Sequence, residues 1–330
     1  MKNKLLIICG PTATGKTRLG IKLSQHFKGE IISADSRQVY LGMDIVTGKD
    51  VNNSTRQPAD KLQAEIQKEL KEKVWIGNYT LSEIPIWMLD IVKPDQKFSV
   101  GLYQKIAKHI IEDIWRRHKL PIVIGGTGLY IKSLIDKINT LSIPPDWKLR
   151  EQLNNKTREQ LKTELKRLDL QKFRQMNKSD KNNPRRLIRA IEIVRQAQPI
   201  NRLRKIKINK KLIIGLKTKS FKDLYQRIDE RVEKRVKQGA EKEIKQLLEK
   251  YTWDDSILGT TIGYKQWRGF FEGKASLKET IQHWRFAEHA YARRQMTWFK
   301  KQPQLKWLDI DKKDFDKQAK SIVQRWYGKD

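Results

Sequence analysis

The residues with the clearest chemical signature stand near the start of the chain. Residues 10–17 match the phosphate-loop pattern G-x-x-x-x-G-K-[ST], follow the apolar run 5–9 and open an amphipathic helical pattern. Two glycines let backbone N–H groups wrap an anion, Lys16 adds positive charge, and the Thr17 hydroxyl can hold Mg²⁺. The loop consists of Gly10, Pro11, Thr12, Ala13, Thr14, Gly15, Lys16 and Thr17. It predicts a polyphosphate ligand, either the terminal phosphates of a nucleotide or the diphosphate of another molecule.

A carboxylate follows the second apolar run of the chain. Asp35 directly follows residues 30–34, and Ser36 and Gln38 lie within the next three residues of the sequence. A carboxylate beside a phosphate loop can coordinate a metal, as in phosphoryl transfer, or accept a proton from a nucleophile that attacks next to the phosphates. It can also cap the following segment. The Ser36 and Gln38 side chains can hydrogen-bond to the edge of a base.

Four short apolar runs indicate the strands that position these groups. They cover residues 5–9, 30–34, 121–124 and 212–216, with helical patterns between the first three. This alternation is typical of an α/β fold with a mostly parallel sheet. Polar or glycine-rich sequence follows the first three runs, as in 35–38 and 125–128. Because ligands gather at the carboxyl ends of parallel strands, we expect these segments to meet in one crevice.

The chain divides into a core and an insertion. We predict a P-loop NTPase-like α/β core that begins in residues 1–140 and contains a polar insertion at about 52–83, where 63–73 has helical character. Residues 141–205 have leucines at helical spacing and predict a basic helical insertion domain that binds nucleic acid. Residues 206–330 complete the core and add C-terminal helices, with helical patterns at 225–250 and 277–299.

The charge of the chain indicates a polyanionic partner. There are 70 Lys and Arg against 38 Asp and Glu, a net charge of +32, and residues 151–211 alone carry 19 basic and 6 acidic side chains. Such an excess is typical of nucleic-acid binding, although a lysine-rich solvated surface would also produce it. The cluster of Arg185, Arg186 and Arg189 beside Pro184 favours phosphate contacts.

The remaining composition excludes several classes of protein. Without an apolar stretch of about 18 residues, the sequence predicts no membrane span. The single cysteine, Cys9, excludes an internal disulfide and a multi-cysteine zinc site, and the five histidines form no recognisable metal motif. Met1-Lys2-Asn3-Lys4 leads directly into the first apolar run, which leaves no room for a signal peptide. We therefore expect a soluble, cytoplasmic protein that is a monomer.

Seven blocks of sequence resemble one known family. They are residues 10–17, 35–45, 125–131, 183–192, 227–232, 263–266 and 292–299. In this order they are similar to the tRNA dimethylallyltransferases, also called tRNA isopentenyltransferases or IPP transferases. The resemblance runs from the first strand to about residue 300. Single blocks other than the first are weak signals, but seven in order are highly specific.

The resemblance implies a prenyl transfer without phosphoryl transfer. The phosphate loop would hold the diphosphate of dimethylallyl diphosphate, and the exocyclic amine of the adenosine on the 3′ side of the anticodon would attack its allylic carbon. Asp35 matches the general base of the family. Lys16, Thr17, Mg²⁺ and Arg231, which matches a diphosphate-binding arginine, would stabilise the leaving group.

The resemblance also implies a set of residues that contact tRNA. Some would read the flipped adenine and others would hold the anticodon arm through its phosphates. They are Asp35, Ser36, Arg37, Gln38, Thr127, Arg185, Arg186, Arg189, Arg293, Arg294 and Gln295.

The chain departs from the family pattern at two places. Glu288-His289 stand where the family usually has Thr-Arg, and Ile86-Trp87 replace a His-His pair. The stretch after Lys49 is also longer than usual. Within the family, the alternative is an enzyme that prenylates free adenine nucleotides. Outside it, the alternatives are a nucleotide or RNA kinase and a non-catalytic ATP-dependent RNA-binding module.

Overall fold

The computed structural model describes residues 3–49, 51, 54–70, 72–136, 138–196 and 207–328. The chain forms two compact units. Unit 1 comprises Met1–Phe98, Leu102–Ile135 and Ile206–Asp330, and unit 2 comprises Ser99–Gly101 and Asp136–Lys205. Each unit is described by itself.

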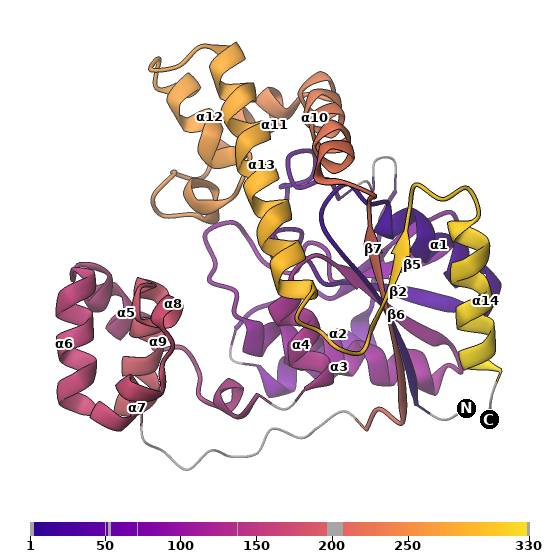
Figure 1. Ribbon diagram of the computed structural model, residues 1–330, viewed down its shortest axis with the longest axis horizontal. Coiled ribbons are helices and arrows are strands. Elements are labelled where there is room, and N and C mark those ends of the chain that lie inside the picture. Colours follow the sequence, from indigo (N-terminus) through magenta and orange to yellow (C-terminus); the bar gives the residue numbers. More distant parts are fainter. Residues whose placement is uncertain are drawn as a thin grey trace. The chain divides into compact units, whose positions relative to one another are not determined.

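Unit 1 is built on one eight-stranded sheet (Figure 1). Its strands are β1 (Lys4–Cys9), β2 (Gly29–Ser33), β3 (Arg56–Pro58), β4 (Gly77–Leu81), β5 (Ile84–Trp87), β6 (Leu120–Gly125), β7 (Lys210–Lys217) and β8 (Leu305–Asp309). They lie in the order β3-β4-β5-β2-β6-β1-β7-β8, and all neighbours from β5 to β8 are parallel. The four predicted strands form its centre as β2-β6-β1-β7, so the predicted α/β fold with a mostly parallel sheet is confirmed.

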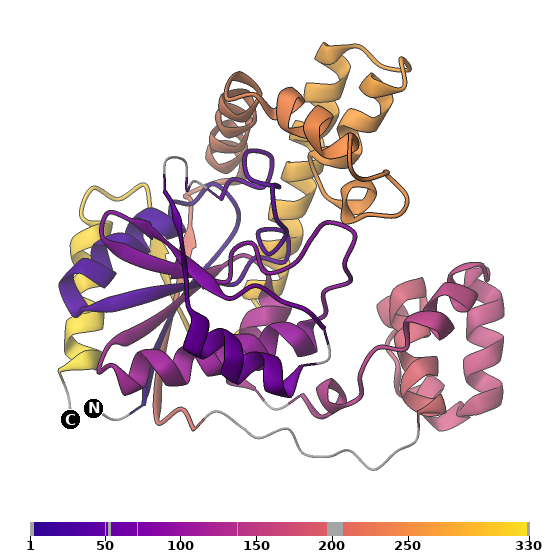
Figure 2. The same cartoon turned by 180° about the vertical axis from the view of Figure 1, so that it is seen from behind.

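The helices of unit 1 are α1 (Lys16–Phe27), α2 (Asp60–Glu69), α3 (Val100–Arg116), α4 (Gly128–Ile135), α10 (Phe221–Lys237), α11 (Ala240–Leu248), α12 (Tyr264–Phe271), α13 (Leu277–Phe299) and α14 (Phe315–Tyr327). Some of them cover the two faces of the sheet, whereas α10, α11 and α12 lie away from it (Figure 1). Figures 1 and 2 show α1 and α14 together on one side of the sheet and α3 and α4 on the other. β1 and β6 are therefore buried on both faces, which explains their continuous apolar sequence.

The parallel register brings three strand ends to the same edge of the sheet. Cys9 of β1 lies opposite Gly125 of β6, and Ser33 of β2 lies opposite Ile124. The Ala34 amide continues the ladder and donates to the Ile124 carbonyl at 2.7 Å. The segments that follow β1, β2 and β6 therefore leave the sheet side by side.

The polar insertion predicted at 52–83 extends the sheet. Its described residues form β3, α2 and β4, and β4 pairs antiparallel with both β3 and β5. Ser82 and Glu83 make the turn between β4 and β5 with φ of 49° and 65°. The helix expected at 63–73 begins earlier, at Asp60, and ends at Glu69. β3, which lies at the edge of the sheet, is short and polar.

The helical pattern expected at 225–250 is divided into two helices. α10 ends at Lys237 and α11 begins at Ala240, with Gly239 between them at φ +100°. A glycine tolerates this left-handed conformation and lets the chain turn without strain. The pattern at 277–299 forms α13 with the predicted ends, and Ser276 and Glu279 make a capping box at its start.

Unit 2 is a small helical bundle. It contains α5 (Trp147–Asn154), α6 (Arg158–Leu168), α7 (Leu170–Gln175), α8 (Lys178–Lys181) and α9 (Pro184–Arg195). Four of the leucines at helical spacing, Leu149, Leu153, Leu161 and Leu165, pack together in its core with Leu187 of α9. Leu168, which has the same spacing in the sequence, is exposed. Of the insertion predicted at 141–205, residues 197–205 lie outside the described residues.

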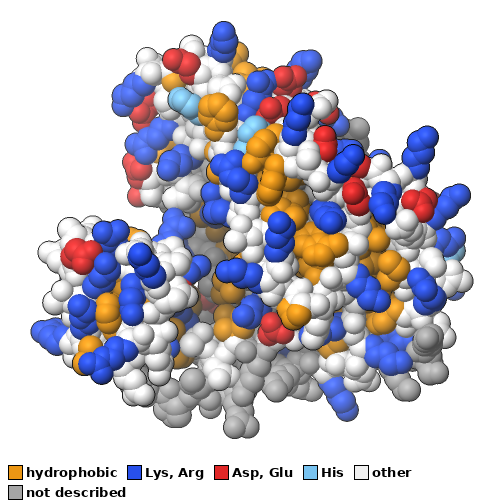
Figure 3. Space-filling model, in the orientation of Figure 1, with side chains coloured by type: hydrophobic (Ala, Val, Ile, Leu, Met, Phe, Trp, Pro, Cys, Tyr) orange, Lys and Arg blue, Asp and Glu red, His pale blue; other side chains and the backbone are white. Residues whose placement is uncertain are grey.

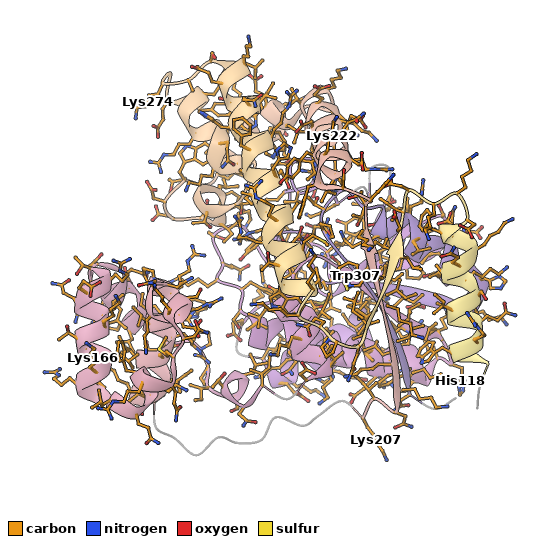
Figure 4. The ribbon with its side chains drawn as sticks, in the orientation of Figure 1. His118, Lys166, Lys207, Lys222, Lys274 and Trp307 are labelled. Atoms are coloured by element: carbon orange, nitrogen blue, oxygen red, sulfur yellow. The ribbon has the colours of Figure 1, made fainter. Side chains whose placement is uncertain are left out.

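Lys and Arg side chains are spread over the visible surface of both units, among hydrophobic and acidic side chains (Figure 3). Figure 4 labels exposed examples on separate elements: Lys166 on α6, Lys222 on α10 and Lys274 just before α13. Among the described residues, none of the helices is both long and apolar enough to cross a membrane.

We predict that Gly125→Ala strongly destabilises the protein. A Cβ at this position would overlap the backbone carbonyl of Ala34 in the neighbouring chain segment, which cannot move without breaking the ladder. We expect a loss of about 2 kcal/mol or more in the free energy of unfolding, measured by chemical denaturation. The control is Gly269→Ala in α12, whose Cβ would meet only the Ala275 Cβ at 3.4 Å. It should be neutral or stabilising, and equal effects of the two substitutions would contradict this explanation.

Candidate active site

The phosphate loop connects β1 to α1 and depends on its glycines. Gly10 has φ +139°, and a Cβ there would overlap the Leu216 carbonyl of β7. Gly15 has φ +74° at the N-cap of α1. The Thr14 hydroxyl donates to the Pro11 carbonyl at 2.8 Å and closes the loop on itself. The loop thus places backbone N–H groups at a helix N-terminus, the arrangement that binds phosphate.

Lys16 lies inside this loop and is poised to bind an anion. Its Nζ donates to the Pro11 carbonyl at 2.6 Å. Burial, followed by the positive charge of Arg231, lowers the pKa of Lys16 to about 8. The negative charges of Asp35 and Glu288 act in the opposite direction. The Lys16 ammonium therefore lies within electrostatic range of all three side chains.

Arg231 reaches the phosphate loop from α10. Its Nη1 donates to the Thr12 hydroxyl at 2.8 Å and its Nη2 to the Gly48 carbonyl at 3.3 Å. Arg227, one turn earlier, instead pairs with Asp311 at 3.0 Å. Of the two arginines in this sequence block, Arg231 is therefore the one that contacts the loop.

Asp35 stands at the same edge of the sheet, directly after β2. Its Oδ1 accepts from the Arg37 amide at 2.8 Å, which makes a tight turn. Among the described residues none of the helices begins here, so the carboxylate is not a helix N-cap. Its charge acts on both Lys16 and Tyr291. Asp35 therefore lies within electrostatic range of Lys16 in the phosphate loop.

Thr127 and Tyr291 surround Asp35 on its other side. The Thr127 hydroxyl accepts from the Ser36 amide at 3.1 Å and hydrogen-bonds with the Tyr291 hydroxyl. Burial and then the Asp35 charge raise the pKa of Tyr291, which keeps its hydroxyl protonated. Thr127 thus ties the turn after β6 to the turn after β2. The sequence did not single out Tyr291, which comes from α13.

Two predicted tRNA contacts use their side-chain amides inside the protein. Gln295 is 5% exposed; its Oε1 accepts from the Thr12 amide at 2.9 Å and its Nε2 donates to the Gly126 carbonyl at 3.1 Å. It links the phosphate loop to the turn after β6 and is not available to RNA. The Gln38 Oε1 accepts a hydrogen bond from the Ser33 hydroxyl at 3.0 Å, and its Nε2 donates to the Gly48 carbonyl at 2.9 Å. To read a base, the Gln38 side chain would have to exchange these two hydrogen bonds for bonds to the base.

Comparison with known proteins places this site in a family. The family model described as IPP transferase matches residues 76–302, and that described as isopentenyl transferase matches residues 3–62. The chain belongs to the IPP transferase family. A tRNA dimethylallyltransferase of Thermoanaerobacter sp. is 35% identical over 341 residues, with 100% of this chain and 99% of the relative covered. One of Carboxydothermus hydrogenoformans is 36% identical, with 98% and 97% covered.

Solved structures of this family have the same fold. The tRNA isopentenylpyrophosphate transferase of Bacillus halodurans superposes with a TM-score of 0.66 at 32% identity, covering 99% of this chain and 96% of that one. A eukaryotic dimethylallyltransferase acting on tRNA has a TM-score of 0.69 at 25% identity, with 98% and 79% covered.

The remaining predicted tRNA contacts differ in their accessibility. On α13, Arg293 and Arg294 are exposed; Arg293 donates to the Tyr225 hydroxyl at 2.7 Å. In unit 2, Arg185 is exposed at the start of α9, and Arg186 is exposed and pairs with Asp180. These four arginines present charge to the surface of their own units.

Arg189 was predicted to contact tRNA, but the structure uses it to build unit 2. It pairs with the buried Glu192 and donates to the Thr140 and Ile143 carbonyls at 2.6 and 2.8 Å. Burial alone would raise the pKa of Glu192, but hydrogen bonds from Arg150 and Arg189 outweigh it and lower that pKa. Arg189 thus neutralises a buried carboxylate of unit 2, and its contact with tRNA stays a prediction.

The two departures from the family pattern have internal partners. Trp87 lies in β5 and its indole N–H donates to the Glu30 carboxylate at 2.8 Å, far along β2 from Asp35. His289 hydrogen-bonds with Asp229 at 2.8 Å and stacks on Tyr225, with ring centroids 4.1 Å apart. Glu288 pairs with Arg235 at 3.0 Å.

Sequence reasoning missed the loop of residues 41–49, which supports Arg231 and Gln38 through Gly48. Glu243 of α11 accepts from the Asp44 and Ile45 amides at 2.9 and 2.6 Å. The buried Lys49 pairs with Asp44 at 2.6 Å and with Asp90. Glu243 and Asp90 come from distant segments, so no local spacing indicated them.

A metal ion at this site would bind with few protein ligands. Within the described residues, no group of three or more His, Cys, Asp or Glu side chains is placed to hold a metal. Thr17, at the start of α1, offers a hydroxyl beside the loop. This donor set suits Mg²⁺, which usually keeps several waters and shares its shell with phosphate oxygens.

We predict that pyrophosphate binding weakens above pH 8. Lys16 has a pKa of about 8 without an anion, so it loses its charge as the pH rises and contributes less to binding. The dissociation constant should rise by up to about tenfold per pH unit relative to Lys16→Arg, which stays charged. Calorimetric titrations of both proteins from pH 6.5 to 9.5 measure this ratio, which cancels the ionisation of the ligand itself. Parallel curves would show that Lys16 does not titrate in this range.

Proposed function

We propose that this protein transfers the dimethylallyl group of dimethylallyl diphosphate to the exocyclic amine of the adenosine on the 3′ side of the anticodon in tRNA. The observation that carries this proposal is the meeting of Arg231, the phosphate loop and Asp35 at one edge of the sheet. The relatives named tRNA dimethylallyltransferase, matched over their full length, support it.

The phosphate loop binds the diphosphate, which is also the leaving group. Backbone N–H groups at the start of α1, the Lys16 ammonium and the Arg231 guanidinium surround it with positive charge. As the C–O bond breaks, negative charge grows on the departing oxygen, so these groups stabilise the transition state more than the bound substrate. Mg²⁺ held through Thr17 would neutralise further charge on the diphosphate oxygens.

Asp35 acts as the general base for the nucleophile. An amine conjugated into a purine is a weak nucleophile, so removal of its proton assists the attack. The new bond joins the exocyclic nitrogen to the allylic carbon, the C–O bond to diphosphate breaks, and the proton passes from the nitrogen to the Asp35 carboxylate. No phosphoryl group is transferred, and ATP is not consumed.

The tRNA binds through both units in this proposal. An enzyme that modifies a base within a folded RNA must take it out of its stack, and Ser36 and Gln38 stand next to Asp35 to read it. Arg185 and Arg186 of α9, with Arg293 and Arg294 of α13, supply charge for backbone phosphates. The neighbour described as acting on tRNA supports this partner. We further propose that the enzyme acts as a monomer, since one chain supplies every residue named here. We also propose that it acts in the cytoplasm.

We predict that Asp35→Asn lowers turnover by about 10²- to 10⁴-fold, the usual contribution of a positioned base. The substitution keeps the side-chain shape and removes a negative charge that acts on Lys16, so the Kd for inorganic pyrophosphate should not rise. The assay follows transfer of labelled dimethylallyl groups to unmodified tRNA, with and without ATP. Turnover near that of the wild type would exclude Asp35 as the base, and formation of one ADP per modified tRNA would favour a kinase.

A second prediction concerns the arginines of α9. Arg185→Ala with Arg186→Ala should raise the KM for tRNA and flatten its dependence on salt by about one log–log unit per lost phosphate contact. The KM for dimethylallyl diphosphate should stay unchanged. The matched control is Arg195→Ala on the same helix, which removes a 2.5 Å pair with the buried Glu164. It should lower the melting temperature and leave the salt slope intact; the same behaviour in the double variant would exclude α9 from the RNA-binding surface.

A further inference from the structure

A buried ion pair lies between α10 and α13. Arg235 Nη1 and Glu288 Oε1 are 3.0 Å apart, and the two side chains are only 5% and 10% exposed. The Arg235 Nε has no hydrogen-bond partner. Two charges removed from water with incomplete hydrogen bonding contribute little to stability, and an apolar pair of similar volume would serve the fold as well. The position of the pair is therefore more informative than its contribution to folding.

Arg235 lies beside Arg231, the arginine that contacts the phosphate loop. The two residues are four apart on α10, so their side chains emerge from the same face of the helix. A Cβ added to Gly48 would collide with Nη2 of both side chains. The two guanidinium groups are therefore packed against the same point of the 41–49 loop, and their charges repel each other.

Glu288, the acidic partner of the pair, acts electrostatically on the phosphate loop. Its negative charge raises the pKa of Lys16 and contributes to the raised pKa of Tyr291. The Glu288 carboxylate is thus close enough to act electrostatically on Lys16 in the phosphate loop and on Tyr291 beside Asp35. It offsets the repulsion between the two guanidinium groups and reduces the excess of positive charge around the loop.

We propose that the Arg235–Glu288 pair sets the net charge of the diphosphate-binding site and that Arg235 is a positioning residue, which holds the Arg231 guanidinium between Gly48 and Thr12. This inference rests on the proposed function, because it assigns the phosphate loop to a diphosphate. Removing either charge should change diphosphate affinity without removing any group that contacts the ligand. The two removals should act in opposite directions, since one subtracts a positive charge and the other a negative charge.

The experiment measures the Kd of inorganic pyrophosphate by calorimetry at pH 7 and low salt, together with kcat and KM for prenyl transfer to unmodified tRNA. We expect Arg235→Met to raise the Kd by roughly tenfold and Glu288→Gln to lower it by several-fold, the scale of one partly screened charge near the site. The double variant should bind pyrophosphate more tightly than Arg235→Met, because the net charge is restored, and less tightly than Glu288→Gln, because the positioning of Arg231 is still lost. In each variant the KM for dimethylallyl diphosphate should follow the Kd. The differences should shrink in high salt.

Two controls separate charge from folding. Glu30→Gln removes a different buried carboxylate, which binds Arg117 and Lys119 away from the phosphate loop. It should lower the melting temperature and leave the Kd unchanged. Arg235→Lys keeps the charge and should retain more affinity than Arg235→Met.

Two outcomes would overturn the inference. If Arg235→Met and Glu288→Gln both weaken pyrophosphate binding, and the double variant is no better than either, the pair has only a structural role. That result would leave the proposed function intact. If the wild-type protein neither binds pyrophosphate nor prenylates tRNA, the proposed function fails, and the assignment of this pair fails with it.

Discussion

The parallel register of β2, β6 and β1 is the constraint on which the site depends. Cys9 opposite Gly125, and Ala34 bonded to the Ile124 carbonyl, bring three strand ends to one level. Gly10 and Gly125 lack side chains where neighbouring backbones approach too closely for a Cβ. The phosphate loop, Asp35 and Thr127 therefore start from adjacent points. A shift of one residue in any of these strands would separate Asp35 from the phosphate loop.

A second layer of contacts holds this edge from the C-terminal half of the chain. Arg231 of α10 donates to the Thr12 hydroxyl, and Gln295 of α13 accepts from the Thr12 amide. The 41–49 loop between them is held by Glu243, which accepts from its backbone amides. Polar groups buried in this way are costly unless paired, so their pairing defines one arrangement of the loop. The geometry of the phosphate loop thus depends on contacts from distant parts of unit 1.

The charges at this edge are balanced around Lys16. Burial, followed by the positive charge of Arg231, lowers the pKa of Lys16 to about 8, and the negative charges of Asp35 and Glu288 act in the opposite direction. In the proposed reaction, a diphosphate would relieve the repulsion between Lys16 and Arg231, because its negative charges would meet cationic groups that are already in place. Binding and leaving-group stabilisation would then depend on the same preorganised charges.

The sequence by itself determined the central strands, the phosphate loop, Asp35 and the leucine core of unit 2, because each depends on neighbouring residues or on a regular period. The resemblance added Arg231, which the structure brings to the loop. Only the tertiary structure decided which polar side chains are used internally. Gln295, predicted as an RNA contact, accepts from the Thr12 amide, and Arg189 donates to the Thr140 and Ile143 carbonyls, all more than 40 residues away in the sequence. The strands β3, β4 and β8 and the Arg235–Glu288 pair were likewise missed. Their pairing depends on long-range packing, which no local pattern encodes.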